Sequence, residues 1–487
     1  MTTISRQKLL AELGRVAPRD ALIADEEALR PFECDGLSMY RELPLLVAIP
    51  ENTTQLRGIL RTCSRLGVPV VTRGAGTGLS GGALPLKNGL LLVLTRLNRI
   101  LDLDPVARTV RVEPGVRNLA VSEAARPHGL YYAPDPSSQI ACSIGGNVAE
   151  NSGGVHCLKY GLTVHNVLEV TLLTIDGEEV ILGGPALDAP GYDLLAVING
   201  SEGMLGVITE VLLRLLPVPQ TAQVVLAGFA TIEDAASAVA AIISAGIVPA
   251  GLEMMDRLAV EAVEAFSAPG YPRDAEAVLL CELDGGSAEV AEQMSRVVDV
   301  LQSHRATSIK ISDGEEERLR LWAGRKNAFP AVGRIKPDYY CMDGTIPRRE
   351  LPRVLGKISE ATQRAGLTVA NVFHAGDGNL HPLIMYDANQ DGQIETAEQL
   401  GAEILRLCIE AGGTVTGEHG VGMEKIDSMC EQFNADELAQ FHALKSAFDP
   451  KGLLNPGKAV PTLHRCAELG AMHVHGGKLP FPDIPRF

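Results

Sequence analysis

Residues 68–82 decide the fold, and they read Val68-Pro69-Val70-Val71-Thr72-Arg73-Gly74-Ala75-Gly76-Thr77-Gly78-Leu79-Ser80-Gly81-Gly82. A short run of β-branched residues, typical of a strand, ends in a loop with five glycines in nine residues. Glycine permits positive φ and lacks a Cβ atom, so the backbone of this loop can come close to another group. The segment therefore predicts a strand followed by a phosphate-binding loop.

Gly76-x-Gly78-x-x-Gly81 also matches the fingerprint of a dinucleotide-binding turn, which requires a helix immediately afterwards. Residues 83–94 instead contain Pro85 and Asn88-Gly89 before an apolar run, which predicts a turn and a strand. We therefore interpret the loop as a concavity of backbone N–H groups that binds an anion outside a Rossmann fold. A glycine-rich surface loop without a ligand is the alternative.

The charge balance argues against two classes of partner. The chain of 487 residues carries 43 Lys and Arg against 60 Asp and Glu, a net charge of -17, and contains no basic block. Nucleic acid and anionic membrane surfaces are therefore poor candidate partners. The length suits about three domains.

Targeting and cysteine signals are also absent from the sequence. Residues 1–20 lack the continuous apolar core of a signal peptide, and no run approaches the ~18 apolar residues of a transmembrane helix. We expect a cytoplasmic protein. The nine cysteines include no C-x-x-C pair, which argues against a disulfide framework, a structural zinc site or an iron–sulfur cluster held by this chain alone.

Proline and glycine divide the chain into segments. Pro217-Val218-Pro219 interrupts the strand pattern, and we place a domain boundary there. From about 220 to 372, strands alternate with helices, which indicates an α+β domain with helices on one face of an antiparallel sheet. Elsewhere the pattern predicts strands over 45–49 and 90–112, helices over 53–66 (N-capped by Thr53 or Thr54), 118–128 and 435–448, and a hairpin turning at Asp176-Gly177.

Four loop signals fall close together between residues 133 and 161, at 133–138, 144–147, 151–154 and 159–161. So much irregular chain is unusual inside a compact domain unless a ligand orders it. We expect these loops to line a ligand; a surface excursion is the alternative.

Two later loops carry the residues for chemistry. His374 and His381 flank a sharp Asp-Gly-Asn turn, and Glu418-His419 lies in a second glycine-flanked loop. Two imidazoles and a carboxylate can hold a catalytic divalent metal with an open position. If His374, His381 and Glu418 bind the metal, His419 is left to act as a base on a hydroxyl whose pKa the metal lowers. Hydrogen-bonding or surface histidines are the alternative.

Basic residues gather at Arg325-Lys326 and at Arg334-Ile335-Lys336. Arginine suits bidentate binding of a substrate carboxylate, and Arg325, close to the only tryptophan, Trp322, is the preferred candidate. A solvated basic face is the alternative for the others.

Several motifs in combination resemble those of the FAD-linked oxidases of the vanillyl-alcohol-oxidase superfamily. Within it they are most similar to the FAD-binding subunits of bacterial glycolate oxidases (glycolate dehydrogenases). The motifs are residues 72–82, Pro134-Asp135-Pro136, Gly145-Gly146-Asn147, Gly200-Ser201-Glu202-Gly203, 374–381, Gly417-Glu418-His419-Gly420 and Asn455-Pro456-Gly457-Lys458.

The resemblance implies an α+β protein with a two-subdomain, PCMH-type FAD-binding domain and an α+β cap domain with an antiparallel sheet. The implied domains are an N-terminal helical segment (1–39), the FAD domain (40–218), the substrate-binding cap (219–425) and a segment that returns to the FAD domain (426–487). Covalent members attach FAD through a histidine in the first loop; none lies between Val68 and Gly82, so we expect non-covalent FAD. The implied FAD contacts are Arg73, Gly74, Ala75, Gly76, Thr77, Gly78, Pro134, Asp135, Gly145, Gly146, Asn147, Asn151, Gly153, Gly154, Tyr160, Glu202, Gly203, Ile208 and Asn455.

The resemblance also implies roles for the later loops. Related D-2-hydroxyacid dehydrogenases hold a divalent metal (Zn, Mn or Fe) through residues matching His374, His381 and Glu418. The residue matching His419 acts at the substrate hydroxyl, and that matching Arg325 holds the carboxylate. The 2-hydroxyglutarate branch has an asparagine where this chain has Leu383 and a lysine near the position of Cys341, so the resemblance favours a short substrate.

We therefore expect oxidation of a small 2-hydroxy acid, glycolate or D-lactate, by hydride transfer from C2 to flavin N5. Electrons would pass to a second FAD-domain subunit and an iron–sulfur subunit, through which the protein would associate with the inner face of the membrane. The tail with His464, Cys466, His473 and His475 is either a docking surface or an extension without a redox role. The alternatives are a D-lactate or D-2-hydroxyglutarate dehydrogenase acting alone, a flavin-free metal-dependent hydrolase, and a silent FAD-binding scaffold.

Overall fold

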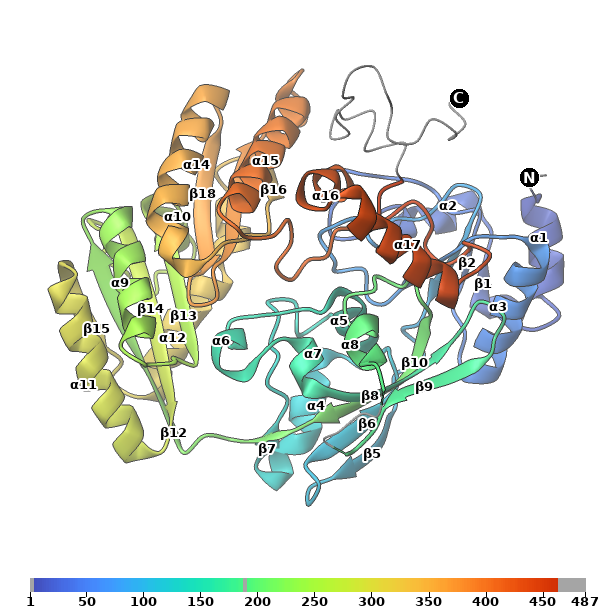
Figure 1. Ribbon diagram of the computed structural model, residues 1–487, viewed down its shortest axis with the longest axis horizontal. Coiled ribbons are helices and arrows are strands. Elements are labelled where there is room, and N and C mark those ends of the chain that lie inside the picture. Colours follow the sequence, from blue (N-terminus) through green and yellow to red (C-terminus); the bar gives the residue numbers. More distant parts are fainter. Residues whose placement is uncertain (1–3, 187–190, 463–487) are drawn as a thin grey trace. The chain divides into compact units, whose positions relative to one another are not determined.

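The structure is a computed structural model that describes residues 4–186 and 191–462. The chain separates into two compact units, coloured along the sequence in Figure 1. The first unit comprises Met1–Ser152, Leu162–Leu216 and Glu418–Phe487, and the second comprises Gly153–Gly161 and Pro217–Gly417. The expectation about the tail with His464 and Cys466 lies outside the described residues.

The first sheet of the first unit carries the glycine loop. Its order is β1-β2-β4-β3, in which β2, β4 and β3 are parallel and β1 is antiparallel to β2. The strands are β1 (Leu22–Ile23), β2 (Leu46–Ala48), β3 (Val70–Arg73) and β4 (Leu90–Val93). The glycine loop joins β3 to β4 without a helix, which confirms that it is not a Rossmann turn.

Helix α3 (Thr53–Leu66) connects β2 to β3 and packs on α1 (Arg6–Leu13). Its bounds are those predicted, because apolar residues recur at helical spacing and bury Leu56, Ile59 and Leu60. The predicted cap was wrong: Asn52, not Thr53 or Thr54, accepts the hydrogen bond from the backbone N–H of Gln55.

The second sheet of the first unit is antiparallel, with the order β5-β6-β10-β8-β9. Its strands are β5 (Ile100–Asp104), β6 (Thr109–Val112), β8 (Val167–Leu173), β9 (Glu179–Gly183) and β10 (Val207–Arg214). The hairpin predicted to turn at Asp176-Gly177 is confirmed by the pairing of β8 with β9, and Gly177 has the left-handed φ of 74° that favours glycine. The two sheets agree with the two-subdomain expectation.

Short helices occupy part of the region predicted as loops. They are α5 (Ile144–Glu150) and α6 (Cys157–Tyr160), and α7 (Thr163–Asn166) follows directly after this region. The Ser143 hydroxyl caps α5 by accepting from Gly146 N at 3.3 Å, and Asn151 ends it in the left-handed conformation. Glycine lowers helix propensity, but at Gly145 a Cβ atom would lie 2.6 Å from Pro114, so close packing requires it there.

The remaining elements of the first unit are short, apart from α17. They are α2 (Glu26–Leu29), α4 (Asn118–Ala125), β7 (Leu130–Tyr131), α8 (Leu194–Ile198), α16 (Ile426–Gln432) and α17 (Ala435–Phe448), with β11 (Leu216–Pro217) at the boundary between the units and 3-10 turns at Arg19–Ala21, Arg30–Phe32 and Arg126–His128.

The second unit contains one eight-stranded sheet, and all of its pairs are antiparallel, as predicted. The order is β15-β12-β14-β13-β18-β19-β16, and β17 also pairs with β19. The strands are β12 (Thr221–Phe229), β13 (Gly251–Asp256), β14 (Ala277–Gly285), β15 (Ala306–Ile311), β16 (Asp338–Cys341), β17 (Gly344–Thr345), β18 (Thr368–His374) and β19 (Asn379–Tyr386).

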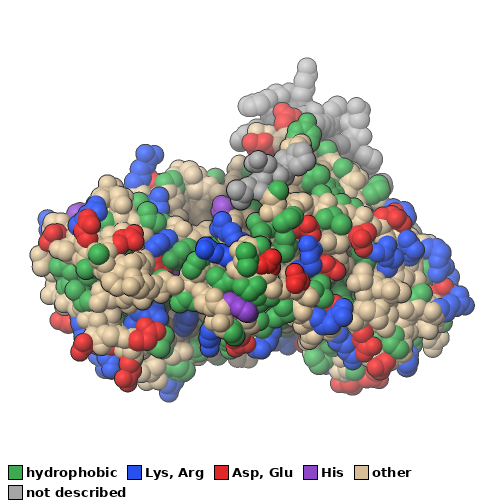
Figure 2. Space-filling model, turned by 90° about the horizontal axis from the view of Figure 1, so that it is seen from below, with side chains coloured by type: hydrophobic (Ala, Val, Ile, Leu, Met, Phe, Trp, Pro, Cys, Tyr) green, Lys and Arg blue, Asp and Glu red, His purple; other side chains and the backbone are tan. Residues whose placement is uncertain are grey.

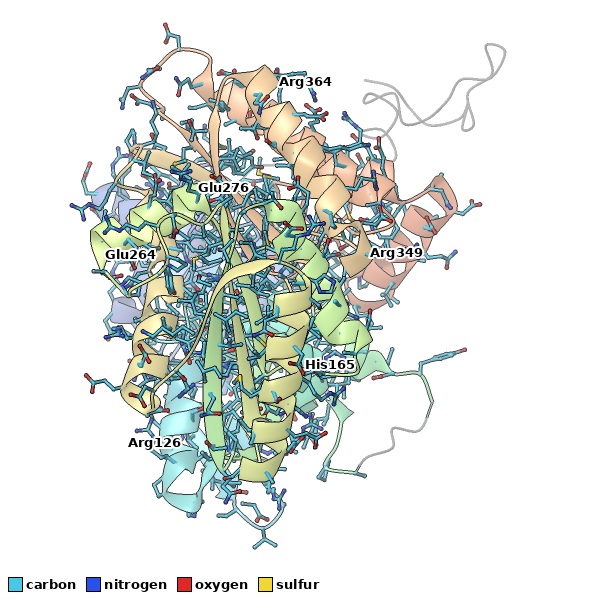
Figure 3. All side chains as sticks on the ribbon, turned by 90° about the vertical axis from the view of Figure 1, so that its left-hand side faces the viewer. Arg126, His165, Glu264, Glu276, Arg349 and Arg364 are labelled. Carbon is cyan, nitrogen blue, oxygen red and sulfur yellow. The ribbon has the colours of Figure 1, made fainter. Side chains whose placement is uncertain are left out.

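Helices cover both faces of this sheet, so the expectation of a single covered face was wrong (Figure 3). One face packs against α10 (Arg257–Phe266), α12 (Glu315–Lys326) and α13 (Ala328–Val332) in one apolar cluster. Other helices that contact the strands are α9 (Ile232–Ser244), α11 (Ser287–Ser303), α14 (Leu351–Ala365), which follows a 3-10 turn at Arg348–Glu350, and α15 (Gln393–Glu410). Strand β14 is buried along eight of its nine residues, as a strand covered on both faces must be.

Charges of both signs are intermingled over the face shown in Figure 2, in keeping with the lack of a basic block in the sequence. Of the helices in residues 4–186 and 191–462, none has both the length and the apolar character needed to cross a membrane.

Two carboxylates of β14 hold the segment Gly153–Gly161 in the second unit. Glu282 lies 3.1 Å from His156 Nε2 and 2.8 Å from Arg318 Nη1, and it accepts a hydrogen bond from Trp322 Nε1. Asp284 accepts from Lys159 Nζ at 2.5 Å and from Tyr160 Oη at 2.6 Å. Burial raises the pKa of a carboxyl group, but His156 and Arg318 outweigh this effect and lower the pKa of Glu282 to about 2.

We predict that Glu282→Gln destabilises the second unit by about 3 kcal/mol at neutral pH, because it removes one partner of a buried ion pair. The pKa of Glu282 lies below its ordinary value of 4.5, so its stabilising contribution is complete above that value and is lost as the pH falls toward about 2. Trp322 is the only tryptophan and lies in this unit, so its fluorescence should report the guanidinium chloride midpoint of both proteins at pH 7 and pH 4.

The matched control is Glu292→Gln, on the exposed face of α11, which should change stability by less than about 0.5 kcal/mol. Equal midpoints for wild type and Glu282→Gln at pH 7 would contradict the prediction.

Candidate active site

The glycine loop lies against the start of α5. Residues 74–79 are partly or fully exposed, and a Cβ atom at Gly74 would lie 2.1 Å from the Ser143 hydroxyl. Gly76 has a φ of 76°, and a Cβ atom there would meet the Arg73 guanidinium at 2.3 Å. Only glycine allows this approach, which brings the backbone of the loop close to the start of α5. The backbone N–H groups of a glycine loop and of a helix start suit a diphosphate.

A cavity of about 420 Å³ opens beside this loop. Its size falls in the range of small-molecule sites. It is lined by Ala75, Thr95, Asn98, Ile100, Gly115, Val116, Arg117, Ala120, Ala141 and Ser143. Of the predicted FAD contacts only Ala75 lines it. Thr95, Asn98 and Arg117 supply polar groups that the motifs did not indicate, because Thr95 and Asn98 lie in the connection between β4 and β5 and Arg117 precedes α4.

Arg73 has a structural partner. Its side chain is 8% exposed and donates to the backbone carbonyls of Phe32, at 3.1 Å, and Cys34. It therefore fixes the end of β3, where the glycine loop begins, to the segment that follows α2.

The last part of the chain closes on the other end of the glycine loop. Asn455 Nδ2 donates to the carbonyls of Gly82, at 3.0 Å, and Glu202, at 2.7 Å. The Glu202 carboxylate accepts from the backbone N–H groups of Val421 and Gly422 at 2.7 and 2.6 Å. The two predicted FAD residues Glu202 and Asn455 are thus brought together, with Gly203 next to them.

Buried charges surround this junction. Lys458 Nζ donates to Gly82 O at 3.0 Å and to Asn455 Oδ1 at 2.9 Å, and burial lowers the pKa of this lysine to about 7. Burial and the neighbouring Glu202 raise the pKa of Glu150 well above its ordinary value. The glycine loop therefore ends in a region of low dielectric, where charges interact strongly.

Asn147 joins the predicted ligand-lining loops to one another. Its Oδ1 accepts from Asn118 Nδ2 at 3.1 Å, and its Nδ2 donates to Ser152 Oγ at 3.3 Å. Asn118 Nδ2 also donates to Pro134 O at 3.1 Å. Asn118 was not singled out from the sequence, although it fixes the positions of Pro134-Asp135 and Gly145-Gly146-Asn147.

Other predicted FAD contacts lie elsewhere. Asn151 Oδ1 accepts from Val164 N at 2.9 Å, and Ile208 is buried in β10. Gly153, Gly154 and Tyr160 belong to the second unit, where the Tyr160 hydroxyl donates to Asp284.

The second unit brings His374 and His381 together. His374 ends β18 and His381 lies near the start of β19, where it pairs with Val372. Their ring centroids are 5.0 Å apart and their planes are nearly perpendicular, at 88°. The rings are 5% and 1% exposed, so the sharp turn predicted between them does place two imidazoles in one buried location.

Each imidazole has an acceptor at Nδ1. His374 Nδ1 lies 2.8 Å from Glu253 Oε1, and His381 Nδ1 lies 3.1 Å from the carbonyl of Met342. An acceptor there requires Nδ1 to carry the hydrogen, so Nε2 of each neutral ring carries the lone pair. This is the tautomer that ligates a metal. The predicted third ligand, Glu418, and His419 begin the last segment of the first unit, so the units divide the four residues.

Arg325 lies on the same face of the sheet. It is 1% exposed, its Nε donates to Glu253 Oε2 at 2.8 Å, and its Nη2 lies 2.7 Å from the same oxygen. Burial would raise the pKa of Glu253, but His374 and Arg325 together lower it. The bidentate edge predicted to face a substrate carboxylate therefore faces Glu253. The neighbouring Lys326 and Arg334 are exposed, as a solvated basic face requires.

Cys341 and Leu383 form an apolar surface beside the histidines. They are register partners on β16 and β19 and are 4% and 0% exposed. Cys341 Sγ lies 3.9 Å from His381 Nδ1. No charged side chain occupies either position.

The loop that carries Glu418 starts from a fixed point in the second unit. Gly417 N donates to the carbonyl and the carboxylate of Asp343, at 2.8 and 3.0 Å. A Cβ atom at Gly417 would lie 2.6 Å from the Asn379 side chain, and Asn379 is the register partner of His374. The residue before Glu418 therefore lies next to β18 and β19, the strands that carry His374 and His381.

Comparison with known proteins agrees with this arrangement. Residues 44–183 match the family described as "FAD binding domain", and residues 218–459 match "FAD linked oxidases, C-terminal domain". The chain is 62% identical to glycolate oxidase subunit GlcD of Escherichia coli (strain K12) over 484 residues, which cover 99% of this chain and 97% of that protein.

More distant proteins extend the comparison. The glycolate oxidase subunit GlcD of Bacillus subtilis (strain 168) is 39% identical, with 88% of this chain and 91% of that protein covered. The structure of p-cresol methylhydroxylase superposes with a TM-score of 0.79 at 16% identity, covering 94% of this chain and 97% of that one, which shows a shared fold. The two matched domains, the relatives and the glycine loop agree, and the chain belongs to the family of FAD-linked oxidases.

Proposed function

We propose that this protein is an FAD-dependent dehydrogenase of a small 2-hydroxy acid, with glycolate as the first candidate and D-lactate as the second. The observation that carries the proposal is the buried pair His374 and His381, whose Nε2 atoms carry the lone pairs of metal ligands, in an FAD-linked oxidase. The relatives named glycolate oxidase subunit GlcD supply the candidate substrate.

The first unit would hold FAD without a covalent bond. The close approach at Gly74 and Gly76 and the cavity beside Ala75 fit a diphosphate and part of a nucleotide. No histidine lies in residues 68–82 to attach a flavin. Bound FAD supplies a two-electron acceptor for the C2–H bond of the substrate.

His374, His381 and Glu418 would hold a divalent metal. Glu418 follows Gly417, which packs on the register partner of His374, so a single peptide bond separates the third ligand from a residue beside the first. A bound Zn²⁺, Mn²⁺ or Fe²⁺ supplies a Lewis acid that lowers the pKa of a coordinated hydroxyl.

His419 would take the proton of the substrate hydroxyl, since it follows the proposed metal ligand directly and a neutral imidazole is a base near pH 7. Arg325 would meet the substrate carboxylate through Nη1, because Nε and Nη2 face Glu253. The substrate thus loses one proton from its hydroxyl and a hydride from C2, and leaves as a 2-oxo acid.

Cys341 and Leu383 limit the substrate. A second carboxylate beside them would be buried without a cationic partner, at a cost of several kcal/mol. This favours glycolate or D-lactate over D-2-hydroxyglutarate. Membership of the FAD-linked oxidases removes the flavin-free hydrolase alternative.

We extend the proposal to partners. The relatives are named as subunits, and no C-x-x-C pair in this chain indicates an iron–sulfur cluster of its own. A second FAD-domain subunit and an iron–sulfur subunit would take the electrons, and the complex would associate with the inner face of the membrane.

We predict that glycolate bleaches the flavin of the purified holoenzyme under anaerobic conditions, with D-lactate next. D-2-hydroxyglutarate should react on the order of 100-fold more slowly, because Cys341 and Leu383 offer its second carboxylate no charge to pair with. Stopped-flow absorbance of the oxidised flavin measures all three. A flavin that stays oxidised with every acid would support the silent scaffold and overturn the proposal.

We predict that His419→Ala slows bleaching by glycolate by about 100- to 10,000-fold, the usual contribution of a general base. FAD content should not change, which the flavin absorbance per protein measures. The matched control is His128→Ala, an exposed histidine of the first unit, which should react at the wild-type rate. A His419→Ala variant as fast as wild type would remove this residue from the mechanism.

A further inference from the structure

We infer that Glu253 is a positioning residue for the metal: it fixes His374 in the orientation and tautomer that present Nε2. The inference rests on the metal site of the proposed function. Glu253 carries no motif in the sequence and is separated from His374 by 121 residues, so only the fold brings them together.

The strand register places Glu253 opposite His374. In the pairing of β13 with β18, Met254 pairs with Phe373 and Met255 with Val372, so the next position along joins Glu253 to His374. Side chains alternate along a strand, so both point to the face covered by α10, α12 and α13. The two backbones thus hold the carboxylate and the imidazole on neighbouring strands, which is more rigid than a loop.

The two carboxylate oxygens have separate partners. Oε1 contacts His374 Nδ1 at 2.8 Å, and Oε2 contacts Arg325 Nε at 2.8 Å. Glu253 and Arg325 are each 1% exposed and His374 is 5% exposed. The guanidinium offsets the cost of burying the carboxylate, so the carboxylate stays ionised and acts only as an acceptor. Because an ionised carboxylate can only accept a hydrogen bond, Nδ1 of His374 must carry the hydrogen.

The same hydrogen bond also fixes the direction of the other ring nitrogen, Nε2. With Nδ1–H directed at Glu253, rotation of the imidazole would sacrifice a charge-assisted hydrogen bond in a buried location. Nε2 therefore stays aimed in one direction, on the side of the ring away from Glu253. His381 has the same arrangement with a backbone carbonyl, which no substitution removes, so Glu253 is the side chain through which the site can be tested.

The sheet supplies a matched comparison. Glu282, on the neighbouring strand β14, lies on the same face, is 3% exposed, and also contacts a histidine and an arginine. Its histidine, His156, is not a proposed ligand. A comparable Glu–His–Arg group thus lies away from the proposed ligands, and the two glutamates separate a structural role from a positioning role.

The experiment measures Zn²⁺ affinity of the FAD-loaded full chain by competition with a chromophoric chelator, after metal removal. Glu253→Gln leaves one acceptor oxygen for two donors, so we expect affinity about 10- to 100-fold weaker than wild type, the usual effect of removing such a partner. Glu282→Gln should bind Zn²⁺ within about threefold of wild type although it is less stable. Flavin absorbance per protein should be the same in all three.

Glu253→Asp provides the second variant if Glu253→Gln does not yield folded, flavin-loaded protein. It keeps the charge that Arg325 needs but is one methylene too short to reach both partners, so the loss of Zn²⁺ affinity should persist. The inference is overturned if the folded Glu253 variant binds Zn²⁺ as wild type does, or if Glu282→Gln loses as much affinity. A wild-type protein that binds no Zn²⁺ overturns the proposed metal site together with this inference, whereas bleaching by glycolate tests the flavin chemistry independently.

Discussion

The burial of charge on one face of the eight-stranded sheet is the constraint on which the second unit depends. A carboxylate removed from water is costly unless donors occupy its oxygens, and Glu253 and Glu282 each meet that condition with one histidine and one arginine. The helix α12 supplies both arginines, Arg318 and Arg325, so a single helix places a positive charge beside each of the two carboxylates. The apolar cluster around them excludes water and strengthens each pair. Stability and the geometry of His374 therefore come from the same contacts.

The first unit is under a different constraint, because it must leave room for a ligand inside a well-packed domain. Glycines do this where backbone must touch backbone or a neighbouring hydroxyl, as at Gly74 against Ser143. Gly422 shows the same principle at the other end of the loop, since a Cβ atom there would lie 2.1 Å from the carbonyl of Ser80. Polar side chains such as Asn118 and Asn455 then hold the loops from behind by bonding to backbone carbonyls. These contacts fix the positions of the loops before a ligand binds, which lowers the entropic cost of binding.

Much of the fold could be predicted where one local signal dominates. Helices α3 and α17 have the predicted bounds because helical patterns and N-caps agree there. Helix α5 was missed because Gly145 and Gly146 oppose helix formation, and packing on Pro114 overrides that preference. The paired histidines could be found from a turn motif, whereas their partner Glu253 could not, because its role depends on strand register across 121 residues. The contact between Arg325 and Glu253 could not be predicted from the sequence for the same reason.

The passage from the second unit to the first explains why Gly417-Glu418-His419-Gly420 is so compact a motif. Asp343 is fully buried and holds Gly417 N with both its carbonyl and its carboxylate, while its Oδ2 also accepts from Thr416 Oγ1 at 2.6 Å. Gly417 must lack a side chain because Asn379 fills that space, and Gly420 must lack one because a Cβ atom would lie 2.1 Å from Glu150. The two residues between these glycines are thus anchored at one end to the histidine strands and at the other to the buried charges of the first unit. A carboxylate and an imidazole fixed at both ends have little conformational freedom, and this restriction suits the metal ligand and the base that we propose for Glu418 and His419.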